Sequence, residues 1–128
     1  MTDRRAVQAE DAPAAIGPYS HAVVVPPLVY TAGQAGVDPA DGGLVSGGIE
    51  AQTRQTLKNI EAILKAAGSS MARVVKTTVY LANIDDFSVM NRVYGQFFPH
   101  EPPARTSVQA ARLPLGALVE IEAVAVLE

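Results

Sequence analysis

The sequence predicts an α+β fold in which two helices pack on one face of a mixed β-sheet. Three observations support this prediction: runs of β-forming residues towards both ends of the chain, two helical periodicities between them, and no repeat or linker. A chain of 128 residues has room for one hydrophobic core. We therefore expect a single domain over residues 1–128, with elements in the order β-β-α-β-α-β-β.

The N-terminal part predicts an antiparallel hairpin followed by a long loop. The apolar run 21–25 and the β-forming run 28–32 are separated only by Pro26-Pro27. Two such runs across a short break are typical of a hairpin. Residues 36–48 are expected to be mostly loop, because they are rich in Gly, Asp and Pro.

Two amphipathic helices are expected in the middle of the chain. From Ile49 to Ala67, apolar and small residues recur at steps of three and four, and Gly68 is a suitable residue to end the helix. The second helix is expected to begin near residues 84–86, whose acids suit a helix N-terminus, and to end at Pro99.

Three more strands are expected at residues 73–81, 106–111 and 118–127. One face of the first of them carries residues of low polarity: Val75, Thr77, Val79 and Leu81. The opposite face is not clearly polar either, so this strand is expected to be covered on both sides. The helices cover one side, and the other side is left for a partner chain.

The composition favours an oligomer that does not bind nucleic acid. Hydrophobic residues make up 48% of the chain, and a small domain has little interior for them, so apolar surface is expected in a subunit interface. The formal net charge is −3, and the basic residues are scattered apart from Arg4-Arg5. No nucleic-acid partner is therefore expected.

The residue inventory also limits the compartment and the cofactors. Cysteine is absent, which excludes disulfides and thiolate ligands and is compatible with the cytoplasm. No segment resembles a signal peptide or reaches about 20 consecutive apolar residues, so we expect a soluble, cytoplasmic protein without a membrane partner. His21 and His100 share no metal-binding motif, and we expect neither a metal nor a cofactor.

Arg105 and Glu120 are the main candidates for chemistry. Pro102-Pro103 stiffens the approach to Arg105, whose guanidinium could bind a carboxylate through two parallel hydrogen bonds. An ion pair at the surface is the alternative. Glu120 and Glu122 project from the same face of the last strand, either at a sheet surface or in a functional pocket.

Three further residues have both a functional and a structural interpretation. Asn91 lies on the apolar stripe of the second helix, where it either serves a site or caps a nearby strand end. Tyr19 follows the turn at Gly17-Pro18 and either lines a cleft or packs at its rim. His21 is expected to be a structural residue rather than a catalytic base.

Six segments resemble sequence signatures of the reactive-intermediate deaminase (Rid, YjgF-like) family. They are residues 12–20, 30–34, 75–81, 91–94, 103–114 and 119–123. They follow one another in the order that the family shows and cover nearly the whole chain, so the resemblance is much more specific than a single short motif.

The resemblance implies a chorismate-mutase-like fold and a homotrimer, with the sheets forming a central barrel and three sites in clefts between subunits. It also implies a cofactor-independent deaminase. Its substrates would be small 2-imino acids derived from 2-aminoacrylate, namely 2-iminopropanoate and 2-iminobutanoate. Water would convert these reactive metabolites to 2-oxo acids and ammonia.

The resemblance implies two catalytic residues, Arg105 and Glu120. Arg105 would hold the substrate carboxylate, and Glu120 would orient or deprotonate the attacking water. The remaining substrate-binding positions are Tyr19 from the partner subunit, Gly33, Asn91 and the backbone near Ser107.

Two departures from the family pattern lie near these positions. Many deaminating relatives carry cysteine at the position of Ser107 and serine at that of Ala32. A non-catalytic module that binds small carboxylates, or acts like a chaperone on the same trimer, is the alternative function. A ribonuclease, an activity attributed to some members, is disfavoured by the acidic net charge.

Overall fold

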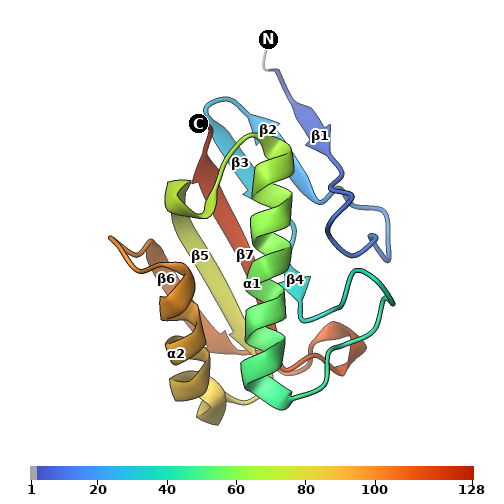
Figure 1. The fold of residues 1–128 in the computed structure, drawn as a ribbon, viewed down its shortest axis with the longest axis vertical. Helices are drawn as coiled ribbons and strands as arrows, with labels where there is room; N and C mark the ends of the chain where they lie inside the picture. The colour runs from blue at the N-terminus through green and yellow to red at the C-terminus, as the bar shows by residue number, and fades with distance from the viewer. Residues whose placement is uncertain (1–2) are drawn as a thin grey trace.

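Residues 3–128 are described by a computed structural model, in which two helices cover one face of a seven-stranded mixed sheet (Figure 1). The strands are β1 (Arg5–Val7), β2 (Ala22–Val25), β3 (Leu28–Thr31), β4 (Gln34–Ala35), β5 (Val74–Leu81), β6 (Ala104–Gln109) and β7 (Val119–Val126). The helices are α1 (Gly48–Ala67) and α2 (Phe87–Phe97), and short 3₁₀ turns occupy Met71–Arg73, Ile84–Asp86 and Pro114–Gly116. The predicted α+β class is confirmed.

The sheet has the strand order β1-β2-β3-β7-β5-β6, and β4 also pairs with β7. All pairs are antiparallel except β5 with β6, which makes the sheet mixed. The predicted hairpin is confirmed as β2 and β3, with Val24 opposite Val29. The strands β1 and β4 were not expected, because three and two residues are too few to show an alternating pattern.

Both helices that the spacing of apolar residues predicted are confirmed. Gly68 ends α1 in a left-handed conformation with φ 89°, and its N–H donates to the carbonyls of Leu64 and Lys65. The α2 helix begins at Phe87, after a 3₁₀ turn in which the Asn83 side chain accepts a hydrogen bond from the Asp85 N–H. The acids expected at the helix N-terminus therefore form this preceding turn.

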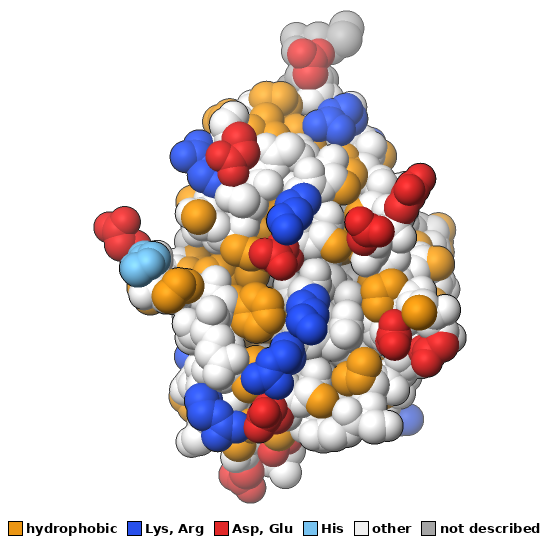
Figure 2. All heavy atoms as spheres, in the orientation of Figure 1, with side chains coloured by type: hydrophobic (Ala, Val, Ile, Leu, Met, Phe, Trp, Pro, Cys, Tyr) orange, Lys and Arg blue, Asp and Glu red, His pale blue; other side chains and the backbone are white. Residues whose placement is uncertain are grey.

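The core lies between the helices and the sheet. Its largest fully buried side chains come from both layers: Leu57, Ile60, Ile63 and Leu64 of α1, Met90 and Val93 of α2, and Val24, Val29, Val79, Leu81, Val119 and Ile121 of the strands. On the outer face of the helices, acidic and basic side chains are interspersed (Figure 2). Two of the arginines there, Arg54 and Arg92, form ion pairs with Glu50.

One sequence expectation about β5 is wrong. Val75 does not share the inner face with Thr77, because the pairing with β7 shifts register between Val74 and Lys76. This irregularity turns Val74 inward, at 8% exposure, and leaves Val75 45% exposed. The sequence alone, where inward and outward residues are assumed to alternate strictly, cannot reveal such a register shift.

The sheet face opposite the helices is partly open in residues 3–128. Tyr30 is 46% and Val108 is 42% exposed, and polar contacts join neighbouring strands of this face. Lys76 Nζ donates to Thr106 Oγ1 at 2.8 Å, and the Tyr80 hydroxyl donates to Glu122 at 3.3 Å. In the same part of the chain, no helix combines the length and the apolar character needed to cross a membrane.

Candidate active site

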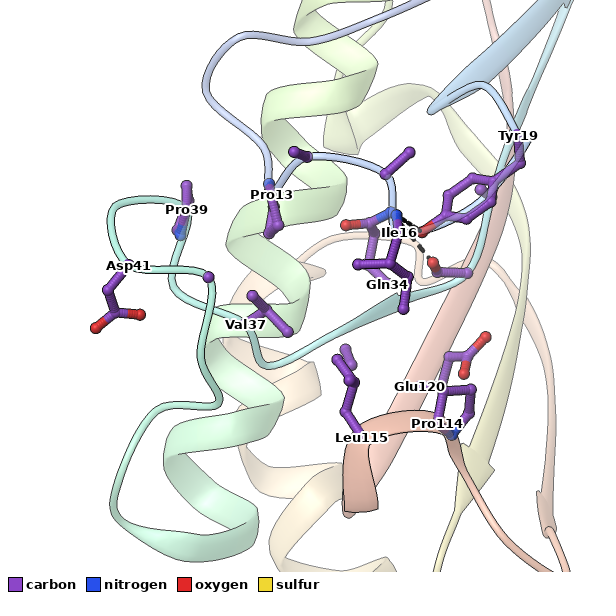
Figure 3. Close-up of a pocket in the computed structure, with 16 residues that line it drawn as sticks. Pro13, Ile16, Tyr19, Gln34, Val37, Pro39, Asp41, Pro114, Leu115 and Glu120 are labelled. Atoms are coloured by element: carbon purple, nitrogen blue, oxygen red, sulfur yellow. Dashed lines mark hydrogen bonds between the residues drawn. The ribbon is translucent and has the colours of Figure 1, made fainter.

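A pocket of about 540 Å³ opens beside the start of β7. Its walls come from the N-terminal segment 13–19, the segment 32–42 and the turn at Pro114 and Leu115. Figure 3 shows Glu120 and Tyr19 on one side of this pocket, and Pro39 and Asp41 on the other. The lining is mostly apolar, so the Glu120 carboxylate is the main ionisable group available to a ligand near the sheet.

The N-terminal wall of the pocket is fixed by His21. Its ring is buried, with Nδ1 accepting a hydrogen bond from the Ala9 N–H at 2.9 Å and Nε2 donating to the Pro13 carbonyl at 2.8 Å. The Tyr19 hydroxyl accepts a hydrogen bond from the Ile16 N–H at 3.2 Å (Figure 3). Both ring nitrogens of His21 are thus used in structure, which confirms the structural interpretation of this residue.

Glu120 is partly buried, and Gly33 lies directly beside it. A Cβ atom built on Gly33 would collide with the Glu120 carboxylate, so the absence of a side chain there makes room for this group. Burial raises the pKa of the Glu120 carboxyl, and the nearby charge of Glu122 raises it further. Ala32, one of the two departures from the family pattern, also lines this pocket.

Arg105 lies elsewhere, on β6 against helix α2. Its Cζ atom is 4.8 Å from the centre of the Tyr94 ring and 5.4 Å from that of Phe87. Its Nη1 atom faces the Met90 sulfur at 4.0 Å, which is a weak acceptor. Within residues 3–128 Arg105 forms no ion pair, since both observed ion pairs belong to Glu50. The surface ion pair considered as the alternative for Arg105 is therefore not formed within this part of the chain.

Two polar oxygens near Arg105 also lack partners. Asn91 and Arg105 line the same shallow depression of about 400 Å³, and Ser107 is on the same face of β6, two residues further on. Asn91 Oδ1 and Ser107 Oγ are buried without a hydrogen bond in the described residues. Asn91 therefore does not cap a strand end through this oxygen. Unpaired buried oxygens of this kind need a donor from water, a ligand or a neighbouring molecule.

The six predicted residues form two groups on opposite faces of the sheet. Arg105 points to the helical side, as its contacts with α2 show. Glu120 lies between Val119 and Ile121, which are fully buried in the helix-covered core, so its side chain points to the other side. The strand β5 separates β6 from β7. One chain thus brings together Tyr19, Gly33 and Glu120, and separately Arg105, Asn91 and Ser107.

Sequence reasoning missed the aromatic surroundings of Arg105. Phe87 and Tyr94 occupy the apolar stripe of α2, together with Met90. Their spacing of three and four residues was visible in the sequence, but which strand residue faces them depends on the sheet order. No three His, Asp or Glu side chains within residues 3–128 cluster in a way that could hold a metal ion.

Comparison with known proteins identifies the family. The sequence profile of the family described as "Endoribonuclease L-PSP" matches residues 9–127. The chain belongs to the endoribonuclease L-PSP family. Among L-PSP relatives, the human protein named 2-iminobutanoate/2-iminopropanoate deaminase is 52% identical over 123 residues, which cover 96% of this chain and 90% of the relative.

Solved structures similar to this L-PSP chain carry the same fold. RidA from the Antarctic bacterium Psychrobacter sp. PAMC 21119 is 44% identical, with a TM-score of 0.93 over 96% of this chain and 99% of that one. TdcF from E. coli, solved with bound serine, is 40% identical, with a TM-score of 0.91 over 97% and 99% of the two chains. The resemblance to the reactive-intermediate deaminases inferred from the sequence is thereby confirmed.

Proposed function

We propose that this protein is a 2-iminobutanoate/2-iminopropanoate deaminase, which hydrolyses small 2-imino acids to 2-oxo acids and ammonia. The observation that carries the proposal is the Arg105 guanidinium, which has no carboxylate partner in the described residues and lies near two unpaired oxygens. The human relative of that name, identical at 52% of the aligned positions, supports the same activity.

The site is formed between subunits of a homotrimer. Arg105 and Glu120 point to opposite faces of one sheet, so they can reach one small substrate only if they come from different chains. The open sheet face, with Tyr30 and Val108 exposed, forms the central barrel of a chorismate-mutase-like assembly. The chain acts as a single domain over residues 1–128 and works in the cytoplasm.

The chemistry needs few groups because an imine carbon is already electrophilic. Arg105 holds the substrate carboxylate with parallel hydrogen bonds, which positions the C=N group. The carboxylate of Glu120 takes a proton from water as the oxygen bonds to the imine carbon. The same proton then goes to the nitrogen, which gives a carbinolamine. The hydroxyl proton of the carbinolamine passes to its amino nitrogen, the C–N bond breaks, and ammonia and the 2-oxo acid are released.

The other predicted residues complete the cleft. Tyr19 borders the Glu120 pocket of one subunit, and Gly33 leaves the space that the carboxylate occupies. Asn91 and the backbone near Ser107 lie on the Arg105 side of the neighbouring subunit. A serine at position 107 still provides the same backbone groups, so the loss of the relatives' cysteine is compatible with activity.

A coupled assay tests this function. A pyridoxal-phosphate dehydratase converts serine to 2-aminoacrylate, and pyruvate release is followed with and without the purified protein. We expect release to be faster than the uncatalysed hydrolysis of the imine. Binding of 2-oxobutanoate without any acceleration would instead support the non-catalytic carboxylate-binding module.

The pH dependence of turnover is expected to respond to Glu122. Glu120 acts as a base only when ionised, so kcat/KM falls as the pH drops through its raised pKa. Glu122→Gln removes the neighbouring negative charge and lowers the pKa of Glu120, while burial, the larger cause, remains. The acid limb of the kcat/KM profile should therefore move to lower pH. An unmoved or raised limb would contradict the assignment of Glu120 as the base.

A further inference from the structure

The guanidinium of Arg105 rests on an aromatic platform that belongs to a different element. Tyr94 and Phe87 both lie on α2, with ring centres 4.8 and 5.4 Å from Arg105 Cζ. These distances are within the range in which a cation is attracted to an aromatic face. The position of α2 therefore decides where the guanidinium of this β6 residue lies.

The Tyr94 ring is itself fixed from inside the core. Its hydroxyl and that of Thr77 are 2.6 Å apart, and Thr77 is 1% exposed. Thr77 is also the partner of Arg105 in the parallel pairing of β5 with β6. The three residues thus form a closed set of contacts, through the strand pairing, the hydroxyl bond and the ring.

This arrangement leaves the polar edge of the guanidinium available. The one hydrogen bond that its side chain makes in the described residues is the weak one from Nη1 to the Met90 sulfur at 4.0 Å. A flexible arginine would lose rotamer freedom when it binds a carboxylate, and this loss weakens binding. A guanidinium that is already held against a ring loses less.

We propose that Tyr94 is a positioning residue for substrate binding, whose ring, fixed by Thr77, holds Arg105 in the orientation that receives a carboxylate. This inference rests on the proposed function, because Arg105 is the group through which Tyr94 acts. Tyr94→Leu should raise KM for 2-iminobutanoate by about tenfold and leave kcat nearly unchanged, because it removes the nearer ring of the platform without touching the Glu120 pocket. Tyr94→Phe retains the ring and should recover most of this loss.

The experiment compares these two variants with Thr77→Val, which removes the hydroxyl partner of Tyr94, and with the control Phe97→Leu. Phe97 is an aromatic residue of the same helix that packs against the core and is not one of the two rings facing Arg105. The control should keep the KM of the wild type even if its melting temperature falls. Thr77→Val should resemble Tyr94→Phe. Tyr94→Met, which also removes the ring, replaces Tyr94→Leu as the test if that variant does not fold.

A double variant separates positioning from a general structural effect. In an Arg105→Ala background, Tyr94→Leu should change kcat/KM no further, since its effect passes through the guanidinium. An unchanged KM in Tyr94→Leu, or an equal loss with and without Arg105, would overturn the inference. If the wild type shows no deamination, the proposed function fails, and calorimetric titration with 2-oxobutanoate then tests the role of Tyr94 in carboxylate binding alone.

Discussion

Arg105→Ala should lose most deaminase turnover while the oligomer remains intact. The substitution removes the group that we assign to the substrate carboxylate, and hydrogen bonds to charged groups of this kind contribute about 1.5–3 kcal/mol each. Loss of a bidentate pair therefore corresponds to a fall in kcat/KM of about a hundredfold or more. Steady-state kinetics in the coupled assay measures this fall, and light scattering after gel filtration monitors the assembly.

Two companion variants make this result specific. Arg105→Lys should recover little activity, because an ammonium group cannot reproduce the planar fork of the guanidinium. Arg54→Ala removes an equal charge from the outer face of α1, where the arginine pairs with Glu50, and should behave as the wild type. Normal kcat/KM in Arg105→Ala would refute the assignment of this residue.

Two inactive variants should restore each other's activity when they assemble together. Gly33→Val is expected to be inactive, because its side chain displaces the Glu120 carboxylate. The backbone of Gly33 does not have a positive φ, so valine can adopt it and the fold should persist. In random trimers of Gly33→Val with Arg105→Ala, about one neighbouring pair in four joins an intact Arg105 to an intact Glu120 pocket.

About a quarter of the wild-type activity is therefore expected after the two variants are unfolded and refolded together. Mixing the two assembled proteins without unfolding should give no recovery, and native mass spectrometry identifies the mixed oligomers. Mixed oligomers that remain inactive would show that the site is not shared between chains in the way that we propose.

The elements that the sequence predicted well are those with a strong local pattern. The apolar steps from Ile49 to Ala67 and the glycine that follows them sufficed for α1, and the two runs around Pro26-Pro27 sufficed for the hairpin. The strand β4 was not predictable, because two residues show no period and their extended conformation depends on pairing with β7. The irregularity at Val75 likewise depends on the partner strand.

Candidate residues for the site could be selected from the sequence, but their arrangement in one chain could not be predicted. Arg105, Glu120 and their companions were selected from motifs that lie within short segments. Their division between two faces follows from the order β7-β5-β6 and from the side on which α2 packs. Neither the strand order nor the side on which α2 packs can be predicted from a local sequence pattern. For the same reason, the contact of Tyr94 with Arg105 could not be predicted.

The placement of Arg105 and Glu120 on opposite faces of the sheet has a consequence for how activity depends on assembly. If the site is shared as we propose, a lone protomer would be inactive, and specific activity would depend on protein concentration. Substitutions at the contacts between protomers, far from either residue, would then abolish activity although no group that contacts the substrate is changed.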